Sequence, residues 1–140
     1  MHWPDAATHE ATSSGNPLFD TYDWLEARVE TLEAAGIAHA RIIIDPGIGF
    51  GKGVAENLAI LNGLALFHGL GCPVLLGASR KRFIGALSNE APVNARLGGS
   101  IAVAMKAAEQ GAQIIRVHDV PETVQALKIW RGMRDQGLAG

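Results

Sequence analysis

Short runs of β-branched and other apolar residues alternate along the chain with longer stretches in which apolar residues recur at helical spacing. The short runs lie at residues 42–44, 74–76 and 113–117 and predict three strands. The first run is three consecutive isoleucines, which is typical of a strand buried on both faces of a parallel sheet. The pattern therefore predicts an α/β protein with parallel strands at its centre.

The stretches between the predicted strands indicate helices. We expect Asp20 or Thr21 to cap the first helix and Gly36 to end it. Residues 1–17 carry no such pattern and are predicted to form an irregular lead-in. The later helices are expected at residues 54–68, shortly after Arg82, at 98–110, and from Asp119 and Pro121 onward.

The spacing of the predicted strands favours repeated strand–helix units. The strands start near residues 42, 74 and 114, which gives units of 32 and 40 residues and suits right-handed parallel crossovers. Polar residues follow all three strands, and (β/α)₈ barrels place their active sites at that end. A complete barrel needs roughly 250 residues, whereas this chain has 140. The fold predicted is a partial (β/α)₈ TIM barrel.

Composition excludes several classes of function. The net charge is −2 and no basic cluster exceeds Arg80-Lys81-Arg82, so binding to nucleic acid has no support. A single cysteine, Cys72, suits a reducing compartment. The sequence shows neither an apolar run of membrane-spanning length nor a basic and apolar leader. We therefore expect a cytoplasmic protein without a membrane partner.

Residues 45–53 carry the strongest signal for a ligand site. Asp45 follows the isoleucines directly, Pro46 stops further strand pairing, and the glycines after it let the backbone approach a ligand closely. This is not a Walker A loop, because Gly53 stands where that loop needs Ser or Thr after its Gly-Lys pair. The glycine spacing does not fit the dinucleotide fingerprint either.

The other two strands end in residues suited to an anionic ligand. Ser79 supplies a hydroxyl and Lys81 a cation after the second strand. Arg116 and His118 are two positions apart on the third, hence on one face, and such a pair suits a phosphate leaving group. The carboxylate of Asp45 suits the paired N–H groups of a heterocycle. We expect Asp45, Lys81, Arg116 and His118 to line one cleft.

Residues 45–52, 77–81 and 115–119 resemble three successive motifs of the dihydropteroate synthase family, in its order and at suitable spacing. Met1 and His2 resemble the end of the family's fifth strand, so the resemblance covers essentially the whole chain. It implies that the 140 residues are a partial pterin-binding domain, the C-terminal half of the barrel and about its last three to four βα units. Met1 is then an internal methionine.

The resemblance also implies an activity. The family contains transferases of folate biosynthesis that join 4-aminobenzoate to 6-hydroxymethyl-7,8-dihydropterin diphosphate and release diphosphate. It implies a homodimer and Mg²⁺ on the diphosphate, with the metal's protein ligand in the N-terminal half of the barrel. Sulfonamides would compete for the 4-aminobenzoate site.

Carried over by position, the resemblance assigns a role to each site residue. Asp45 would bond the pterin ring nitrogens and Lys81 the pterin carbonyl oxygen, while Arg116 and His118 would hold the departing diphosphate. Lys81, Arg116 and His118 are thus the expected catalytic residues. Phe50, Gly51, Ser79 and Arg80 are expected to bind the substrate beside 4-aminobenzoate. Gly77 is a further expected substrate-binding residue.

The chain departs from the family in one respect. The family's first four strands carry further pterin-binding groups and the asparagine associated with the metal, and they have no counterpart here. The chain alone is therefore expected to be inactive. Two alternatives stay open, namely a pterin-binding methyltransferase domain and a non-catalytic half-barrel that dimerises through its final helices.

Overall fold

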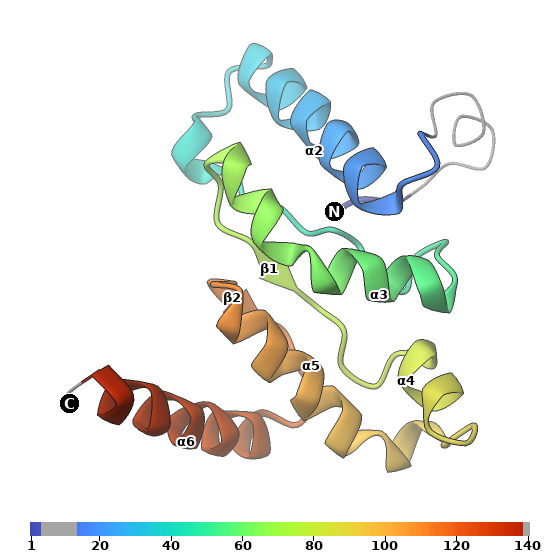
Figure 1. Ribbon diagram of the computed structural model, residues 1–140. Coiled ribbons are helices and arrows are strands. Elements are labelled where there is room, and N and C mark those ends of the chain that lie inside the picture. The colour runs from blue at the N-terminus through green and yellow to red at the C-terminus, as the bar shows by residue number, and fades with distance from the viewer. Residues whose placement is uncertain (4–13, 139–140) are drawn as a thin grey trace.

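The computed structural model describes residues 1–3 and 14–138, and its elements follow the predicted order. Figure 1 shows the α-helices following one another around short parallel segments. The α-helices are α2 (Pro17–Ala34), α3 (Val54–Asn62), α4 (Arg82–Leu87), α5 (Leu97–Glu109) and α6 (Val120–Leu138). The strands are β1 (Leu75–Leu76) and β2 (Ile114–Ile115). Three 3₁₀ helices complete the described elements: η1 (His39–Arg41), η2 (Leu64–Leu70) and η3 (Val93–Ala95).

The strands are parallel, as predicted, but shorter than the apolar runs suggested. β1 pairs with β2 in the register Leu75 with Ile114 and Leu76 with Ile115. The predicted strand at residues 42–44 pairs only at Ile44, in a single parallel bridge to Val74. The backbone N–H of Ile44 donates to Pro73 (3.0 Å), and the carbonyl of Ile44 accepts from Leu75 (2.8 Å). Three extended segments therefore lie side by side in the expected orientation.

The expectation that the isoleucine strand is buried on both faces is wrong. Ile42 and Ile44 are buried, with 5% and 1% of their surface exposed, whereas Ile43 between them is 51% exposed. Alternate side chains of a strand point to opposite faces. The helices therefore cover one face of this segment, and the face that carries Ile43 stays open.

The core lies between the helices and the covered face of the strands. Phe67 and Leu64 of η2 and Ile60 of α3 are fully buried, and they join Leu25 and Val29 of α2 in one cluster. Burying such side chains contributes about 1.5–3 kcal/mol each relative to leaving them exposed. The apolar residues of α2, α3 and η2 thus explain why these helices pack where they do.

The start of α2 corrects the predicted cap. Asn16, not Asp20 or Thr21, is the N-cap, and its side-chain oxygen accepts from the backbone N–H of Leu18 at 3.1 Å. Pro17 takes the first helical position, where its missing N–H costs nothing. The predicted lead-in at residues 1–17 therefore ends one residue early, and most of it lies outside the described residues.

The helix predicted at residues 54–68 is two elements. α3 ends at Asn62, and the tighter turns of η2 follow after Gly63. A Cβ atom at Gly63 would overlap the side chain of Leu18, so the glycine lets α2 approach closely at this break. Close helix packing, which sequence periodicity does not reveal, therefore decides where α3 ends.

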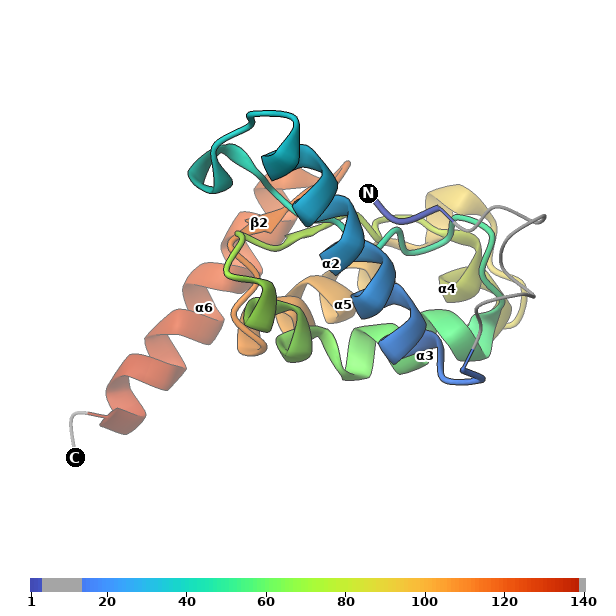
Figure 2. The same cartoon turned by 90° about the horizontal axis from the view of Figure 1, so that it is seen from above.

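The last helix differs from the others in its surroundings. In Figure 2 the far end of α6 projects beyond the rest of the molecule. Val124, Ile129 and Met133 of α6 are 42%, 62% and 66% exposed.

No described helix combines the length and the apolar composition needed to cross a bilayer.

Candidate active site at the strand ends

A cavity of about 180 Å³ lies beyond the carboxyl ends of β1 and β2. The parallel register brings residues that follow β1 beside residues that follow β2, so side chains from both segments converge there. The cavity is lined by Gly77, Ser79, Lys81, Arg116, Val117 and His118. Three of the four residues expected to share a cleft, Lys81, Arg116 and His118, therefore meet at this edge of the sheet.

Ser79 and His118 hold each other across the two segments. The backbone N–H of His118 donates to Oγ of Ser79 (3.3 Å), and Nδ1 of the His118 ring lies 3.0 Å from the same oxygen. Ser79 is buried, with 7% of its surface exposed. When the hydroxyl donates to Nδ1, the ring proton sits on Nε2, which leaves that N–H free to bind an anion.

Gly77 makes room for Arg116. A Cβ atom at Gly77 would lie 2.5 Å from Nη2 of Arg116 and 3.0 Å from its Cζ. The guanidinium therefore lies against the backbone of the neighbouring segment. Any larger residue at position 77 would displace the guanidinium from the cavity.

Lys81 lies where three charged or aromatic groups meet. Its Nζ sits 3.8 Å from the centroid of the Phe50 ring, a cation–π contact. Burial lowers the pKa of Lys81, as does the nearby charge of Arg116, while Asp45 acts in the opposite direction. The Lys81 ammonium therefore lies over the Phe50 ring in a half-buried place.

Asp45 belongs to the glycine loop beside the cavity and does not line the cavity itself. Its Oδ1 accepts from the backbone N–H of Gly47 at 2.8 Å, and its backbone carbonyl accepts from the N–H of His2. One carboxylate oxygen thus stabilises the turn, and Oδ2 makes no hydrogen bond to another described residue. A carboxylate oxygen of this kind can accept an N–H from a ligand.

Arg80 turns away from the cavity. Its Nε and Nη2 donate to Asp119 at 3.0 and 2.5 Å, and this hydrogen-bonded pairing lowers the pKa of Asp119. The backbone of Arg80 has a positive φ of 59°, an uncommon conformation held by a hydrogen bond from its N–H to Oγ of Ser100 (2.8 Å). Arg96 also donates to the Arg80 carbonyl. The pair with Asp119 therefore fixes the turn that carries Ser79 and Lys81.

The remaining predicted residues lie around the cavity. Phe50 packs on Lys81 and on Trp3, whose ring centroid lies 4.9 Å away. Gly51 faces a separate hollow of about 530 Å³, together with Lys52 and other residues. The predicted residues that do not line the cavity are Asp45, Phe50, Gly51 and Arg80.

Sequence reasoning missed the residues that support the site. Asp119 was expected only to open the last helix, yet it pairs with Arg80 from 39 positions away. Lys52 and Asn57 tie the glycine loop together. The charge of Asp119, the last residue of the third motif, was an available signal, but its partner becomes visible only once the strand register is known.

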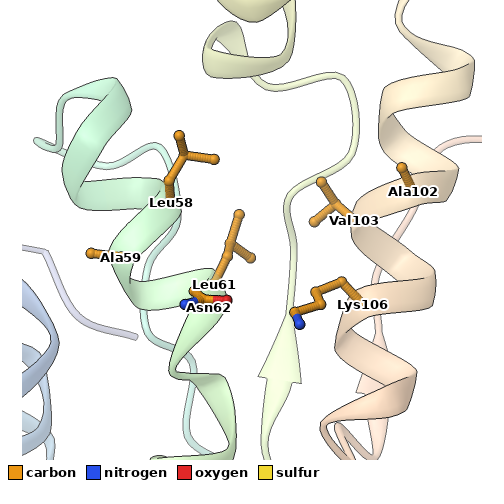
Figure 3. Close-up of a pocket in the computed structure, with 7 residues that line it drawn as sticks. All are labelled: Leu58, Ala59, Leu61, Asn62, Ala102, Val103 and Lys106. Atoms are coloured by element: carbon orange, nitrogen blue, oxygen red, sulfur yellow. The ribbon is translucent and has the colours of Figure 1, made fainter.

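A larger groove of about 520 Å³ shares no lining residue with the cavity. Figure 3 shows side chains of α3 and α5 facing it. It is lined by Leu58, Ala59, Leu61, Asn62, Ala102, Val103 and Lys106. Apart from one ammonium and one amide these walls are apolar, with no acid–base pair and no converging set of polar groups. The chemistry therefore points to the smaller cavity.

Comparison with known sequences agrees with this geometry. The model of the family described as "Pterin binding enzyme" matches residues 1–118. The chain is 50% identical to dihydropteroate synthase of Escherichia coli over 102 residues, which is 73% of this chain and 36% of that protein. It is 42% identical to that of Haemophilus influenzae over 125 residues, 86% of this chain and 45% of that protein. The chain thus spans less than half the length of these relatives.

Solved structures give the same picture. Dihydropteroate synthase of Xanthomonas albilineans with 4-aminobenzoic acid is 40% identical, with a TM-score of 0.87, and the match covers 96% of this chain and 48% of that one. The Yersinia pestis enzyme is 41% identical, with a TM-score of 0.86 over 96% of this chain and 53% of that one. The prediction of a partial TIM barrel is confirmed, and the chain belongs to the pterin binding enzyme family.

Proposed function

We propose that the chain supplies the part of a dihydropteroate synthase active site that binds the pterin and the leaving group. The observation that carries the proposal is the convergence of Lys81, Arg116 and His118 on one cavity at the strand ends. The names of the relatives support it, and one solved relative is described in complex with 7,8-dihydropteroate. The reaction joins 4-aminobenzoate to 6-hydroxymethyl-7,8-dihydropterin diphosphate in folate biosynthesis.

Arg116 and His118 would hold the diphosphate as it leaves. The amine nitrogen of 4-aminobenzoate attacks the CH₂ group and forms the C–N bond as the C–O bond breaks. The electron pair of the C–O bond goes to the diphosphate, and the proton of the amine passes to water. Negative charge therefore builds up on the diphosphate. A guanidinium and an Nε2–H donor, preset by Gly77 and Ser79, stabilise that charge without rearranging.

The pterin would lie between Asp45 and Lys81. Oδ2 of Asp45 can accept an N–H of the pterin ring while Oδ1 keeps its bond to Gly47. The ammonium of Lys81 can donate to the pterin carbonyl oxygen from its place over the Phe50 ring. Their opposite charges match the donor and acceptor edges of one heterocycle.

4-Aminobenzoate would bind beside Phe50 and Gly51, near Ser79 and Arg80. Arg80 uses Nε and Nη2 for Asp119, so Nη1 remains to donate to the carboxylate of the substrate. Ser79 is held by His118, so it contributes to this region mainly through His118. Sulfonamides would compete for the same place.

Mg²⁺ is expected from the family, bound to the diphosphate. Among the described residues, no group of three or more His, Cys, Asp or Glu side chains could hold a metal ion. The described residues therefore form no cluster that could hold the ion by itself, and the family's protein ligand for the metal belongs to the N-terminal half of the barrel.

We also propose a homodimer in the cytoplasm. Ile129 and Met133 are exposed and lie one turn apart on the same face of α6, and exposed apolar side chains on one face support self-association through the final helices. The cytoplasm is proposed from the single cysteine, which suits a reducing compartment. Molar mass by light scattering tests the dimer, and a monomer at all concentrations would contradict it.

Calorimetric titration of the purified chain with two ligands tests the function. The proposal expects the pterin diphosphate to bind and methyltetrahydrofolate to bind more weakly, because only the first engages Arg116 and His118. Tighter binding of methyltetrahydrofolate would favour the pterin-binding methyltransferase instead. Self-association without binding of either ligand would favour the alternative of a non-catalytic half-barrel that dimerises.

A further inference from the structure

The glycine loop between Ile44 and α3 is held by two side chains. Nζ of Lys52 donates to the backbone carbonyls of Gly47 (2.9 Å) and Phe50 (3.2 Å). Asn57, which is 2% exposed, accepts from the N–H of Gly49 (2.7 Å) and donates to the carbonyl of Lys52 (3.2 Å). These bonds tie the loop from inside, in addition to the hydrogen bond from the N–H of His2 to the carbonyl of Asp45 at its start.

The tied loop sets the position of Lys81. Phe50 lies under the Lys81 ammonium, and a Cβ atom at Gly49 would lie only 2.8 Å from Cδ of Lys81. The loop backbone therefore touches the stem of Lys81 while the Phe50 ring touches its charged end. If the loop moves, Lys81 loses both contacts.

Lys52 is an unusual group to find in this place. Burial lowers its pKa to about 8, opposed by the charges of Glu56 and Asp45 and assisted by Lys81. Arg82 and Glu90 face the same hollow from the other side. Filling space would not require an ammonium group. The Lys52 ammonium is therefore needed as the donor that satisfies two backbone carbonyls at once.

We propose that Lys52 is a positioning residue, which holds the glycine loop so that Phe50 keeps the Lys81 ammonium at the cavity. The role of Lys81 toward a pterin rests on the proposed function, whereas the contact between the loop and Lys81 does not. Lys52 itself touches no reacting atom. A neutral amine keeps two N–H donors but loses charge assistance, so deprotonation should loosen the loop rather than release it.

Fluorine NMR of the full chain labelled with 4-fluorophenylalanine tests this directly. The sequence contains four phenylalanines, and Phe50→Leu assigns the signal of interest. Phe67, which is fully buried and does not line the hollow that Lys52 faces, is the internal reference for intact packing. The variants are Lys52→Met, Lys52→Arg as the charged replacement, and Lys128→Met as the control at an exposed lysine on α6.

We expect Lys52→Met to move the Phe50 signal toward that of an unfolded chain at every pH, while the signal of Phe67 stays unchanged. The unsubstituted chain should show a shift of the Phe50 signal centred near pH 8. Lys52→Arg should keep the native position and lose that transition, and any titration left there belongs to Lys81. A Phe50 signal that is the same in Lys52→Met as in Lys128→Met would overturn the proposal.

Binding of 6-hydroxymethylpterin separates this inference from the proposed function. If the unsubstituted chain binds the pterin, Lys52→Met should weaken binding about tenfold, because the misplaced Lys81 no longer meets the ligand. Lys52→Arg should restore most of the affinity at pH 7. Absence of pterin binding by the unsubstituted chain would count against the proposed function alone, since the Phe50 signal still decides the role of Lys52.

Discussion

The strand-end site and the helix α6 differ in how their side chains are satisfied. At the site, Ser79 pairs with His118 and Arg80 with Asp119, each through hydrogen bonds of about 3 Å or less. On α6, Ile129 is 62% and Met133 is 66% exposed. The polar groups of the site find their partners across two neighbouring segments, 39 positions apart in the sequence, whereas apolar side chains need a whole layer of structure to cover them. The pairing of β1 with β2 is therefore enough to organise these contacts while part of the apolar surface stays uncovered.

The largest effect expected from this contrast is on turnover. We predict no measurable dihydropteroate formation by the 140-residue chain alone, because it covers only 48% of a solved relative and fixing two substrates needs contacts from the remaining part. Adding the complementary half of a full-length relative should restore activity by covering open faces such as that of Ile43. The measurement is product formation by the chain with and without that half. Turnover by the chain alone at the rate of an intact enzyme would show that the site needs no such cover.

The sequence predicted the order of elements and the parallel sheet because both depend on local periodicity. The polar groups after each strand could be predicted for the same reason, since Arg116 and His118 are two positions apart on an extended segment. The exposure of Ile43 could not be predicted, because it depends on which elements cover the second face of the sheet. The Arg80–Asp119 pair was equally hidden, because only the register of β1 and β2 brings these residues together.

The second prediction compares apolar residues in the two environments. Phe67→Ala should lower the free energy of unfolding by about 3–5 kcal/mol, because the side chain is fully buried and leaves a cavity. Ile129→Ala should change it by less than about 0.5 kcal/mol in the monomer, since Ile129 is mostly exposed. Urea denaturation at low protein concentration measures both. A large loss for Ile129→Ala that grows with concentration would instead reveal a dimer contact.

The third prediction concerns the leaving group. Arg116→Ala should weaken binding of the pterin diphosphate by about 1.5–3 kcal/mol, roughly tenfold or more, because a charge-assisted contact is lost. The difference should shrink at high salt, since the contact is ionic. Arg41→Ala is the matched control, because Arg41 lies in η1 at the other end of the strand segments. Equal binding by both variants would contradict the assignment of Arg116.

The smallest effect should come from the pairing of Arg80 with Asp119. The hydrogen bonds from Arg80 lower the pKa of Asp119 below its ordinary value, so the pair stabilises the folded state above that ordinary value. The stabilisation is lost as pH falls through the lowered pKa, where the folded state must also take up the proton. Solvent screens a pair this exposed, so the expected change is small.

Unfolding free energies measured between pH 5 and pH 2 should fall less steeply in Asp119→Asn than in the unsubstituted chain, because asparagine cannot take up that proton. Asp23→Asn, at a carboxylate on α2 outside the site, supplies the control and should keep the original slope. Identical slopes for all three proteins would mean that the Arg80–Asp119 pair positions the Ser79–Lys81 turn without stabilising the fold.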